Sequence, residues 1–165
     1  MPTNFEAAFT ERPDVYAAWR QLLMSIRANM DPRRYELATF AAAQRLRSTY
    51  CSIMHGNVLQ NELGEDILAI ANDREGTLGA LDLAVMDLAE RVVVDATSIT
   101  DADLQRLRDF GLTDAEIMDV VLSAAARCFL AKTMDALDVR ADAQFQDLPP
   151  ELQAAYVVGR PIATA

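Results

Sequence analysis

The sequence predicts an all-α fold, a single-domain helical bundle, on three observations. Apolar residues recur at three- and four-residue spacing in most segments, as they do along one face of a helix. Hydrophobic residues make up 52% of the chain and aromatic residues only 7%, a bias toward Ala, Leu, Val and Met that suits helix packing better than a β-sandwich. Two apolar segments are preceded by a threonine with an acidic residue three positions later, which is a helix-start signal. A chain of 165 residues builds one sizeable core, so we expect one domain.

The chain divides into three predicted parts. Residues 1–13 have no periodicity and end at Arg12-Pro13, so we expect an extended arm that packs on the core or on a neighbour. Residues 14–140 carry the helical periodicity and form the predicted domain. Residues 141–165 are polar and contain several prolines, so we expect a tail that wraps around the domain.

The first half of the domain predicts three helices. An apolar stripe predicts a helix over about 14–29. Asp31, followed by proline at the first helical position, starts a second helix that runs to about residue 47. Ser48 is the predicted N-cap of a third helix, which continues to about Leu63 and stops at a glycine.

The second half predicts a short helix over 65–71, a polar connection over 72–76, and a long buried helix from Leu78 to about Val94. Two capped helices follow. Their predicted capping boxes are Thr100 with Asp103 and Thr113 with Glu116, and the first of these helices ends at Gly111. The helix after Thr113 is the most apolar in the chain, so we expect it to pack centrally against the helix that carries Cys51.

Charge and hydropathy exclude several classes of partner. The formal net charge of -10 argues against nucleic acid and against an anionic membrane, because both require a positive surface. No apolar run reaches the ~20 residues of a membrane span, and the N-terminus does not resemble a signal peptide. Two cysteines do not make a disulfide framework, which fits a reducing compartment, and we expect a cytoplasmic protein.

The residues best suited to chemistry lie between Glu36 and His55. Ser48, Cys51 and His55 are spaced so that they share one helix face, which places a thiol beside the only imidazole. The first turn of a helix favours a thiolate at Cys51, and His55 titrates near neutrality and can relay its proton. Glu36 would orient His55 or accept a proton through water.

Each of these residues also has a purely structural interpretation. Cys51 can be a small buried apolar residue, as most lone helical cysteines are. His55 can be a hydrogen-bonded core histidine. Glu36 can be a solvated residue or an ion-pair partner of Arg33.

Three further residues lie in or near the predicted site or carry a thiol. Ser48 is most economically a helix cap. Tyr50 either donates a hydrogen bond in the site or simply lines it. Cys128 is expected to be a packing residue, and a disulfide with Cys51 would require their two helices to face each other at bonding distance. We expect no metal, because one Cys, one His and one Glu lack the spacing of a zinc site, and no cofactor, because no phosphate-binding loop or dinucleotide motif is present.

The run YCSIMHGNVL and the later phrase DLQRLRDFGLTDAEIMDVV resemble the carboxymuconolactone decarboxylase superfamily, and within it the alkylhydroperoxidase D-like, peroxidase-related branch. The resemblance spans most of residues 30–140. Members of the branch carry Cys-x-x-Cys-x-x-x-His, with a glutamate twelve residues before the first cysteine. The matching positions here are Glu36, Cys51 and His55. The resemblance implies the helical bundle of that branch, a homo-oligomer, and an antioxidant oxidoreductase that reduces a small hydroperoxide.

The sequence departs from that motif at its first cysteine, which is Ser48 here. In the family the second cysteine attacks the hydroperoxide and the first resolves the sulfenic acid as a disulfide. A serine hydroxyl cannot form a disulfide, so an external thiol or a redox protein would have to resolve Cys51. This departure keeps two alternatives open: a lactone or keto-acid decarboxylase of the superfamily's other type, and a non-catalytic helical assembly protein.

Overall fold

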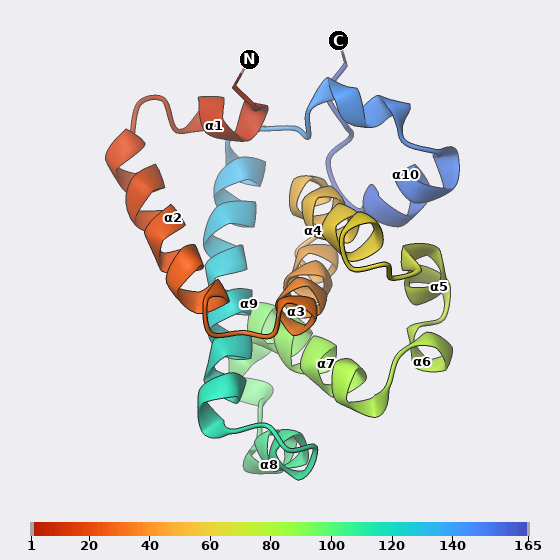
Figure 1. Ribbon diagram of the computed structural model, residues 1–165. Helices are drawn as coiled ribbons and strands as arrows, with labels where there is room; N and C mark the ends of the chain where they lie inside the picture. Colours follow the sequence, from red (N-terminus) through yellow and green to blue (C-terminus); the bar gives the residue numbers. More distant parts are fainter. Residues whose placement is uncertain (1, 165) are drawn as a thin grey trace.

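The computed structural model describes residues 2–164, and within them the chain forms helices and loops without a strand (Figure 1). The predicted all-α fold is thereby confirmed. Residue 1 of the predicted arm and residue 165 of the predicted tail lie outside the described residues. In chain order the α-helices are α1 (Asn4–Ala8), α2 (Pro13–Arg27), α3 (Pro32–Arg45), α4 (Thr49–Asn61), α5 (Ile67–Asn72), α6 (Arg74–Thr77), α7 (Ala80–Asp95), α8 (Asp101–Asp109), α9 (Asp114–Ala136) and α10 (Pro150–Tyr156), with short 3-10 turns at Ala96–Ser98 and Ala143–Asp147.

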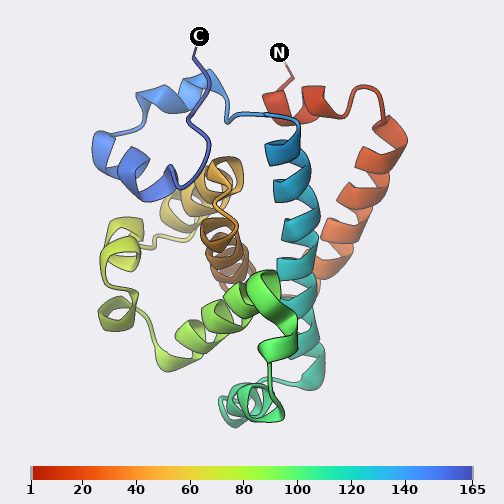
Figure 2. The same cartoon turned by 180° about the vertical axis from the view of Figure 1, so that it is seen from behind.

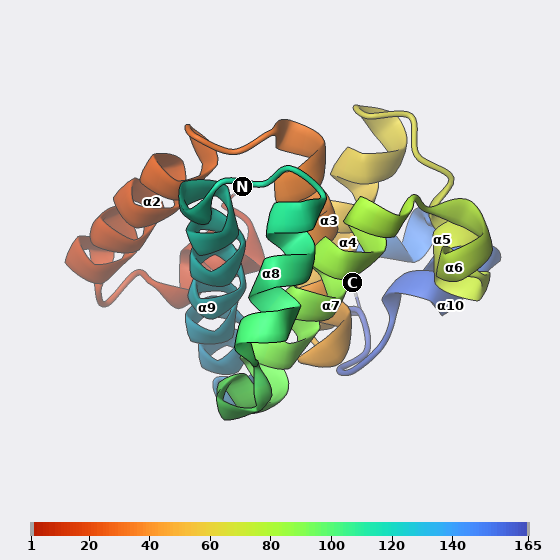
Figure 3. The same ribbon diagram turned by 90° about the horizontal axis from the view of Figure 1, so that it is seen from below.

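Helix α3 is the centre of the molecule. It packs against α4, α7 and α9, and every residue from Tyr35 to Ala43 is buried. The small side chains of Ala41, Ala42 and Ala43 let the neighbouring helices approach its backbone closely. Viewed from below, α2 and α9 lie side by side, and α8 lies at the near end against α7 and α9 (Figure 3).

The expected helix starts are mostly confirmed. The Asp31 side chain accepts a hydrogen bond from the Arg34 backbone N–H, and Thr100 and Thr113 each form the predicted capping box. A side-chain cap stabilises a helix by about 1 kcal/mol, so these residues fix where α3, α8 and α9 begin. Among residues 2–164, no helix is both long and apolar enough to cross a bilayer.

The N-terminal arm is not extended as predicted. Residues Asn4–Ala8 form α1, which begins with a capping box between Thr3 and Glu6. Five residues are too few for a visible apolar period, although the Thr-x-x-Glu spacing was a usable signal. Helix α1 packs on the core through Phe5, whose ring contacts Trp19 edge-on.

A second difference lies between α5 and α7. Residues predicted as a polar connection contain the single turn α6, whose N-cap Asp73 accepts a hydrogen bond from the Gly76 N–H. The long helix α7 then begins at Ala80, after Gly79 as N-cap, rather than near Thr77. One turn held by an aspartate cap is too short to show periodicity.

The most apolar helix is also placed differently from the prediction. Helix α9 packs chiefly on α2, α3 and α7, and α4 packs on α3 instead. The Ala-rich α3 takes the central position because small residues admit neighbours on all sides. Only the C-terminal half of α9 reaches Cys51, through a buried cluster that includes Leu130, Ala131 and Met134.

The turn between α3 and α4 is held by the tail. Arg47 has a φ of 58°, and the Ser48 N–H donates to the Ala43 carbonyl at 3.0 Å, which closes the end of α3. The Gly159 N–H donates to the Thr49 hydroxyl at 3.1 Å. A Cβ at Gly159 would lie 1.8 Å from the Arg47 carbonyl oxygen, so only glycine allows this approach.

The tail leaves the upper end of α9 and crosses to the side of α4 and α5 (Figure 2). Its helix α10 ends in Tyr156, which is fully buried against Gly56 of α4. The Tyr156 hydroxyl donates to Gln60 at 3.2 Å. The tail therefore fixes α4 from the outside while α3 supports it from the inside.

Candidate functional site

A cavity of about 560 Å³ is lined by residues of α2, α3, α4 and α9 and is bordered by α1 and by residues 142–145. Glu36, Cys51 and His55 all line it, and so does Tyr50. The three residues of the predicted motif are therefore brought together. Ser48 is buried, but it is not part of the cavity wall.

Glu36 and His55 form a buried pair across α3 and α4. The Glu36 Oε2 lies 2.6 Å from the His55 Nδ1, and both side chains are almost fully buried. The other carboxylate oxygen of Glu36 lies 3.4 Å from Arg27, a half-exposed residue at the rim. Arg33 pairs with Glu65 instead, so the alternative ion pair between Glu36 and Arg33 is not formed.

The environment keeps His55 neutral near pH 7. Burial and the nearby Arg127 guanidinium lower the pKa of His55, and these effects outweigh the hydrogen bond to Glu36, which raises it. In the neutral imidazole the Nδ1–H donates to the carboxylate, so we assign the lone pair to Nε2. That nitrogen is buried and has no partner among residues 2–164.

We expect the imidazole of His55 to titrate below its ordinary pKa of 6.5. Since this is the only histidine in the chain, its proton NMR signal can be followed without assignment. Because the unfolded chain binds this proton near pH 6.5 and the folded chain does not, the free energy of unfolding should also fall as the pH drops below 6.5. A titration midpoint at or above 6.5 would contradict this environment.

Cys51 sits at the inner wall of the cavity. Its side chain is 2% exposed and packs with Trp19 and the C-terminal half of α9. Because the Nε2 of His55 has no partner, the thiol and the imidazole share no direct hydrogen bond. The predicted direct relay from Cys51 to His55 is therefore not formed, and a molecule in the cavity would have to connect the two groups.

Ser48 is the N-cap of α4 by position, but it does not cap the helix with its side chain. A capping hydroxyl at this position would accept the backbone N–H of Cys51, whereas the Oγ is buried without a partner among residues 2–164. The backbone at Ser48 has a ψ of 97°, while the capping threonines Thr3, Thr100 and Thr113 have ψ values of 157°, 164° and 161°. Asp66 caps α5 at a ψ of 90°, so this angle by itself does not prevent a side-chain cap.

Tyr50 is held by the tail rather than by the other site residues. Its hydroxyl donates to Asp142 at 2.5 Å, and burial raises the pKa of Tyr50. The same carboxylate accepts the Asn4 N–H at 2.7 Å, so the arm and the tail meet over the cavity. Phe5, whose ring contacts Trp19 edge-on, also lines this side of the cavity.

Arg127 is a cavity residue that the sequence analysis did not identify. It is buried on α9, its Nη2 donates to the Tyr35 hydroxyl at 3.4 Å, and its guanidinium carbon lies 6.0 Å from the centre of the Trp19 ring. Burial raises the pKa of Tyr35, so this hydroxyl keeps its proton. The sequence does contain a signal for this residue, because Arg127 is a single arginine in the most apolar stretch of the chain, where a buried charge is unusual.

Cys128 takes no part in the cavity. It is half-buried, it does not line the wall, and burial raises the pKa of its thiol. Both cysteines are free. Within residues 2–164, no three His, Cys, Asp or Glu side chains are arranged to hold a metal ion.

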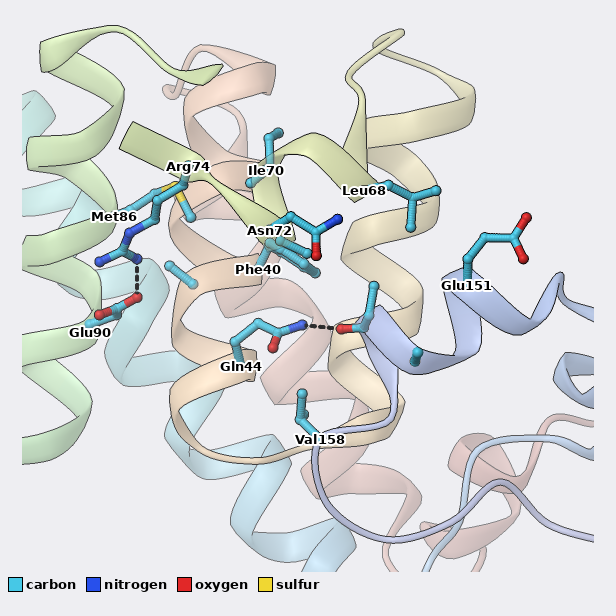
Figure 4. Close-up of a pocket in the computed structure, with 14 residues that line it drawn as sticks. Phe40, Gln44, Leu68, Ile70, Asn72, Arg74, Met86, Glu90, Glu151 and Val158 are labelled. Carbon is cyan, nitrogen blue, oxygen red and sulfur yellow. Dashed lines mark hydrogen bonds and ion pairs between the residues drawn. The ribbon is translucent and has the colours of Figure 1, made fainter. Parts of the chain in front are cut away.

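A larger cavity, of about 730 Å³, lies between α3, α5, α7 and α10 and shares no residue with the first (Figure 4). Three of its polar side chains are already engaged. Arg74 pairs with Glu90, and the Gln44 amide donates to Ser52 at 2.8 Å and to the Ala155 carbonyl at 3.0 Å. Volume alone therefore does not distinguish the two cavities. Of the four buried side-chain polar atoms that lack a partner among residues 2–164, three belong to residues that line the smaller one.

The fold and the cavity define an all-helical domain with a cysteine, a histidine and a glutamate around one buried space. Two solved structures share the fold. One is the alkylhydroperoxidase AhpD core of an uncharacterized peroxidase-related protein from Ralstonia eutropha JMP134, with a TM-score of 0.78 and 19% identity over 87% of this chain and 78% of that chain. The other is an uncharacterized peroxidase-related protein from Silicibacter sp. TM1040, with a TM-score of 0.79 and 18% identity over 89% of this chain and 80% of that chain.

No family model and no curated protein matches the sequence. The chain has the fold of the alkylhydroperoxidase D core, and this confirms the fold that the sequence resemblance implied.

Proposed function

We propose that this protein is a thiol-dependent peroxidase of the alkylhydroperoxidase D-like branch, and that Cys51 reduces a hydroperoxide. The observation that carries the proposal is the arrangement of His55. Its Nδ1 lies 2.6 Å from Glu36, its Nε2 has no partner among residues 2–164, and the residue lines the same cavity as Cys51. A base fixed in one tautomer beside a thiol and a small-molecule cavity is the arrangement that thiol oxidation requires.

The proposed reaction has two stages. In the first, His55 takes the Cys51 proton through the bound substrate, and the thiolate attacks the terminal oxygen of R–O–OH. The O–O bond breaks, the sulfur is oxidised to a sulfenic acid, and the leaving alkoxide takes the proton from His55 to give R–OH. Glu36 stabilises the transient imidazolium.

The second stage requires a reductant from outside the chain. A small thiol or a redox protein attacks the sulfenic acid, releases water and leaves a mixed disulfide, and a second thiol then restores Cys51. Cys128 is outside the cavity wall, so it is not placed to resolve Cys51. A reducing cytoplasm would supply such thiols.

Hydroperoxide consumption in the presence of an excess small thiol tests the proposed function. We expect the wild-type protein and the Cys128→Ser variant to turn over, and the Cys51→Ser variant to show only the background rate. Equal rates in all three proteins would reject the peroxidase and would leave the decarboxylase and the non-catalytic alternatives.

We also propose that the protein is a homo-oligomer in which a second copy covers the outer face of α2 and α9. An apolar groove of about 480 Å³ runs between these helices, and it shares Trp19 with the candidate site. Large apolar side chains remain exposed along it, namely Leu22, Leu122 and Phe129. We expect sedimentation at micromolar concentration to give an oligomer and a Leu122→Asp variant to shift it toward the monomer. A monomeric wild-type protein would contradict the assembly.

A further inference from the structure

Arg127 is a buried positive charge without an ion-pair partner in the described part of the chain. Its side chain is 3% exposed, and it forms no ion pair with a carboxylate of residues 2–164. Its Nη2 donates to the Tyr35 hydroxyl, and its Nε has no partner among the same residues. An isolated buried charge is unfavourable unless an opposite charge or good hydrogen bonds compensate it. A bound anion would supply both.

The unpartnered polar atoms of this chain converge on the same cavity. Four buried side-chain nitrogen or oxygen atoms of the described chain lack a partner, and three of them belong to Trp19, His55 and Arg127, which all line the cavity. These three residues are 8%, 9% and 3% exposed. Trp19 Nε1–H and Arg127 Nε–H are donors, whereas His55 Nε2 is the acceptor assigned above. Two donors and one acceptor around one cavity suit a molecule with an anionic group and a hydroxyl group.

The surroundings favour a singly charged organic acid. Glu36, Glu62 and Asp142 also line the cavity, so a multiply charged anion such as a phosphate would meet repulsion. The planar guanidinium matches a carboxylate in geometry and in charge. The remaining wall is largely apolar and suits a hydrocarbon body, since it includes Phe5, Leu23, Val58, Leu130, Met134 and Phe145.

We propose that Arg127 and Trp19 bind the carboxylate of the substrate, so that the preferred hydroperoxide is one that carries a carboxylate. This inference rests on the proposed function for the reacting end of the molecule, where Cys51 and His55 meet the O–O bond. Arg127 acts here as a substrate-binding residue in the same cavity.

Trp19 is the only tryptophan, so its fluorescence reports binding directly. We expect benzoate to change the fluorescence of the wild-type protein, and benzamide, which has the same shape without the charge, to bind about tenfold or more weakly. Arg127→Met should lose the preference for benzoate, Arg127→Lys should keep part of it, and Arg20→Met, which removes an exposed charge outside the cavity, should keep all of it.

The methionine variant should fold, because replacing an uncompensated buried charge by an apolar side chain of similar length is often neutral or stabilising. Its thermal unfolding is measured beside its binding. If Arg127→Met unfolds, the Arg127→Lys variant decides alone. The proposal is overturned if this variant binds benzoate and benzamide with the same affinities as the wild-type protein does. Equal binding of benzoate and benzamide to the wild type, or no binding of either, also overturns it.

A kinetic comparison separates this proposal from the peroxidase proposal. The two oxidants are cumene hydroperoxide and the same compound with a para-carboxylate. We expect the wild-type protein to oxidise Cys51 about tenfold or more faster with the carboxylate compound, and Arg127→Met to remove the difference. Equal rates with both compounds in both proteins reject the carboxylate site and leave the peroxidase standing. Benzoate binding that depends on Arg127, without any Cys51 oxidation, rejects the peroxidase and leaves the carboxylate site standing.

Discussion

Replacing Glu36 by glutamine should slow the oxidation of Cys51 by hydroperoxide by a factor of about 10² to 10⁴, the range that a positioned general base contributes. Among residues 2–164 the carboxylate is the only group bonded to His55 Nδ1, at 2.6 Å. A glutamine amide can donate to Nδ1 and would then favour the tautomer with the proton on Nε2, which cannot accept a proton from the substrate or from Cys51. Stopped-flow measurement of thiol loss at one equivalent of hydroperoxide gives the rate.

The matched control is Glu65→Gln. Both glutamates pair with an arginine. Glu36 is buried and pairs with Arg27, whereas Glu65 is partly buried, pairs with Arg33 and lies outside the cavity. This variant should oxidise at close to the wild-type rate. If Glu36→Gln also keeps the wild-type rate while remaining folded, Glu36 does not position His55 for the reaction, and the buried pair is only structural.

Replacing Ser48 by cysteine should give the chain an internal disulfide after a single turnover. The sulfenic acid at Cys51 would be attacked by the new thiol one helical turn earlier, which releases water and closes the bridge. Mass spectrometry after one equivalent of hydroperoxide should show the loss of two hydrogens, with the bridge mapped between positions 48 and 51. The wild-type protein should instead retain a sulfenic acid until an external thiol is added.

This substitution should cost little stability. The Ser48 hydroxyl makes no cap hydrogen bond to lose, and it is buried without a partner among residues 2–164. A thiol is better tolerated than an unsatisfied hydroxyl in such a place, so the free energy of unfolding should stay equal or rise. A variant that remains a free dithiol under the same oxidant, although folded, would show that Cys51 does not form a sulfenic acid that position 48 can reach.

The sequence predicted the long helices well because each has its own local signals. The caps at Asp31, Thr100 and Thr113 lie beside apolar stripes, and both kinds of signal act over one or two turns. Glu36, Cys51 and His55 were identified for a different reason. Their spacing places them on two successive helices, and the turn at Arg47 then brings these helices face to face.

What the sequence could not predict depends on contacts between distant residues. The partners of Arg127 lie on α2 and α3, and no local pattern shows that its guanidinium meets Tyr35 and Trp19 rather than water. The missing side-chain cap at Ser48 lies at the α3–α4 corner, where the tail also packs through Gly159. The same limit explains why α9 was expected beside Cys51 instead of beside α3 and α7.

The most direct test of a reactive Cys51 is to trap its oxidised form. The protein is treated with one equivalent of hydroperoxide together with a dimedone reagent, which adds to sulfenic acids, and the labelled peptides are mapped by mass spectrometry. We expect the label at Cys51, little at Cys128, and a strong reduction of the Cys51 label in Glu36→Gln. Absence of label at Cys51, or equal label at both cysteines of the wild-type protein, would contradict the proposed peroxidase site.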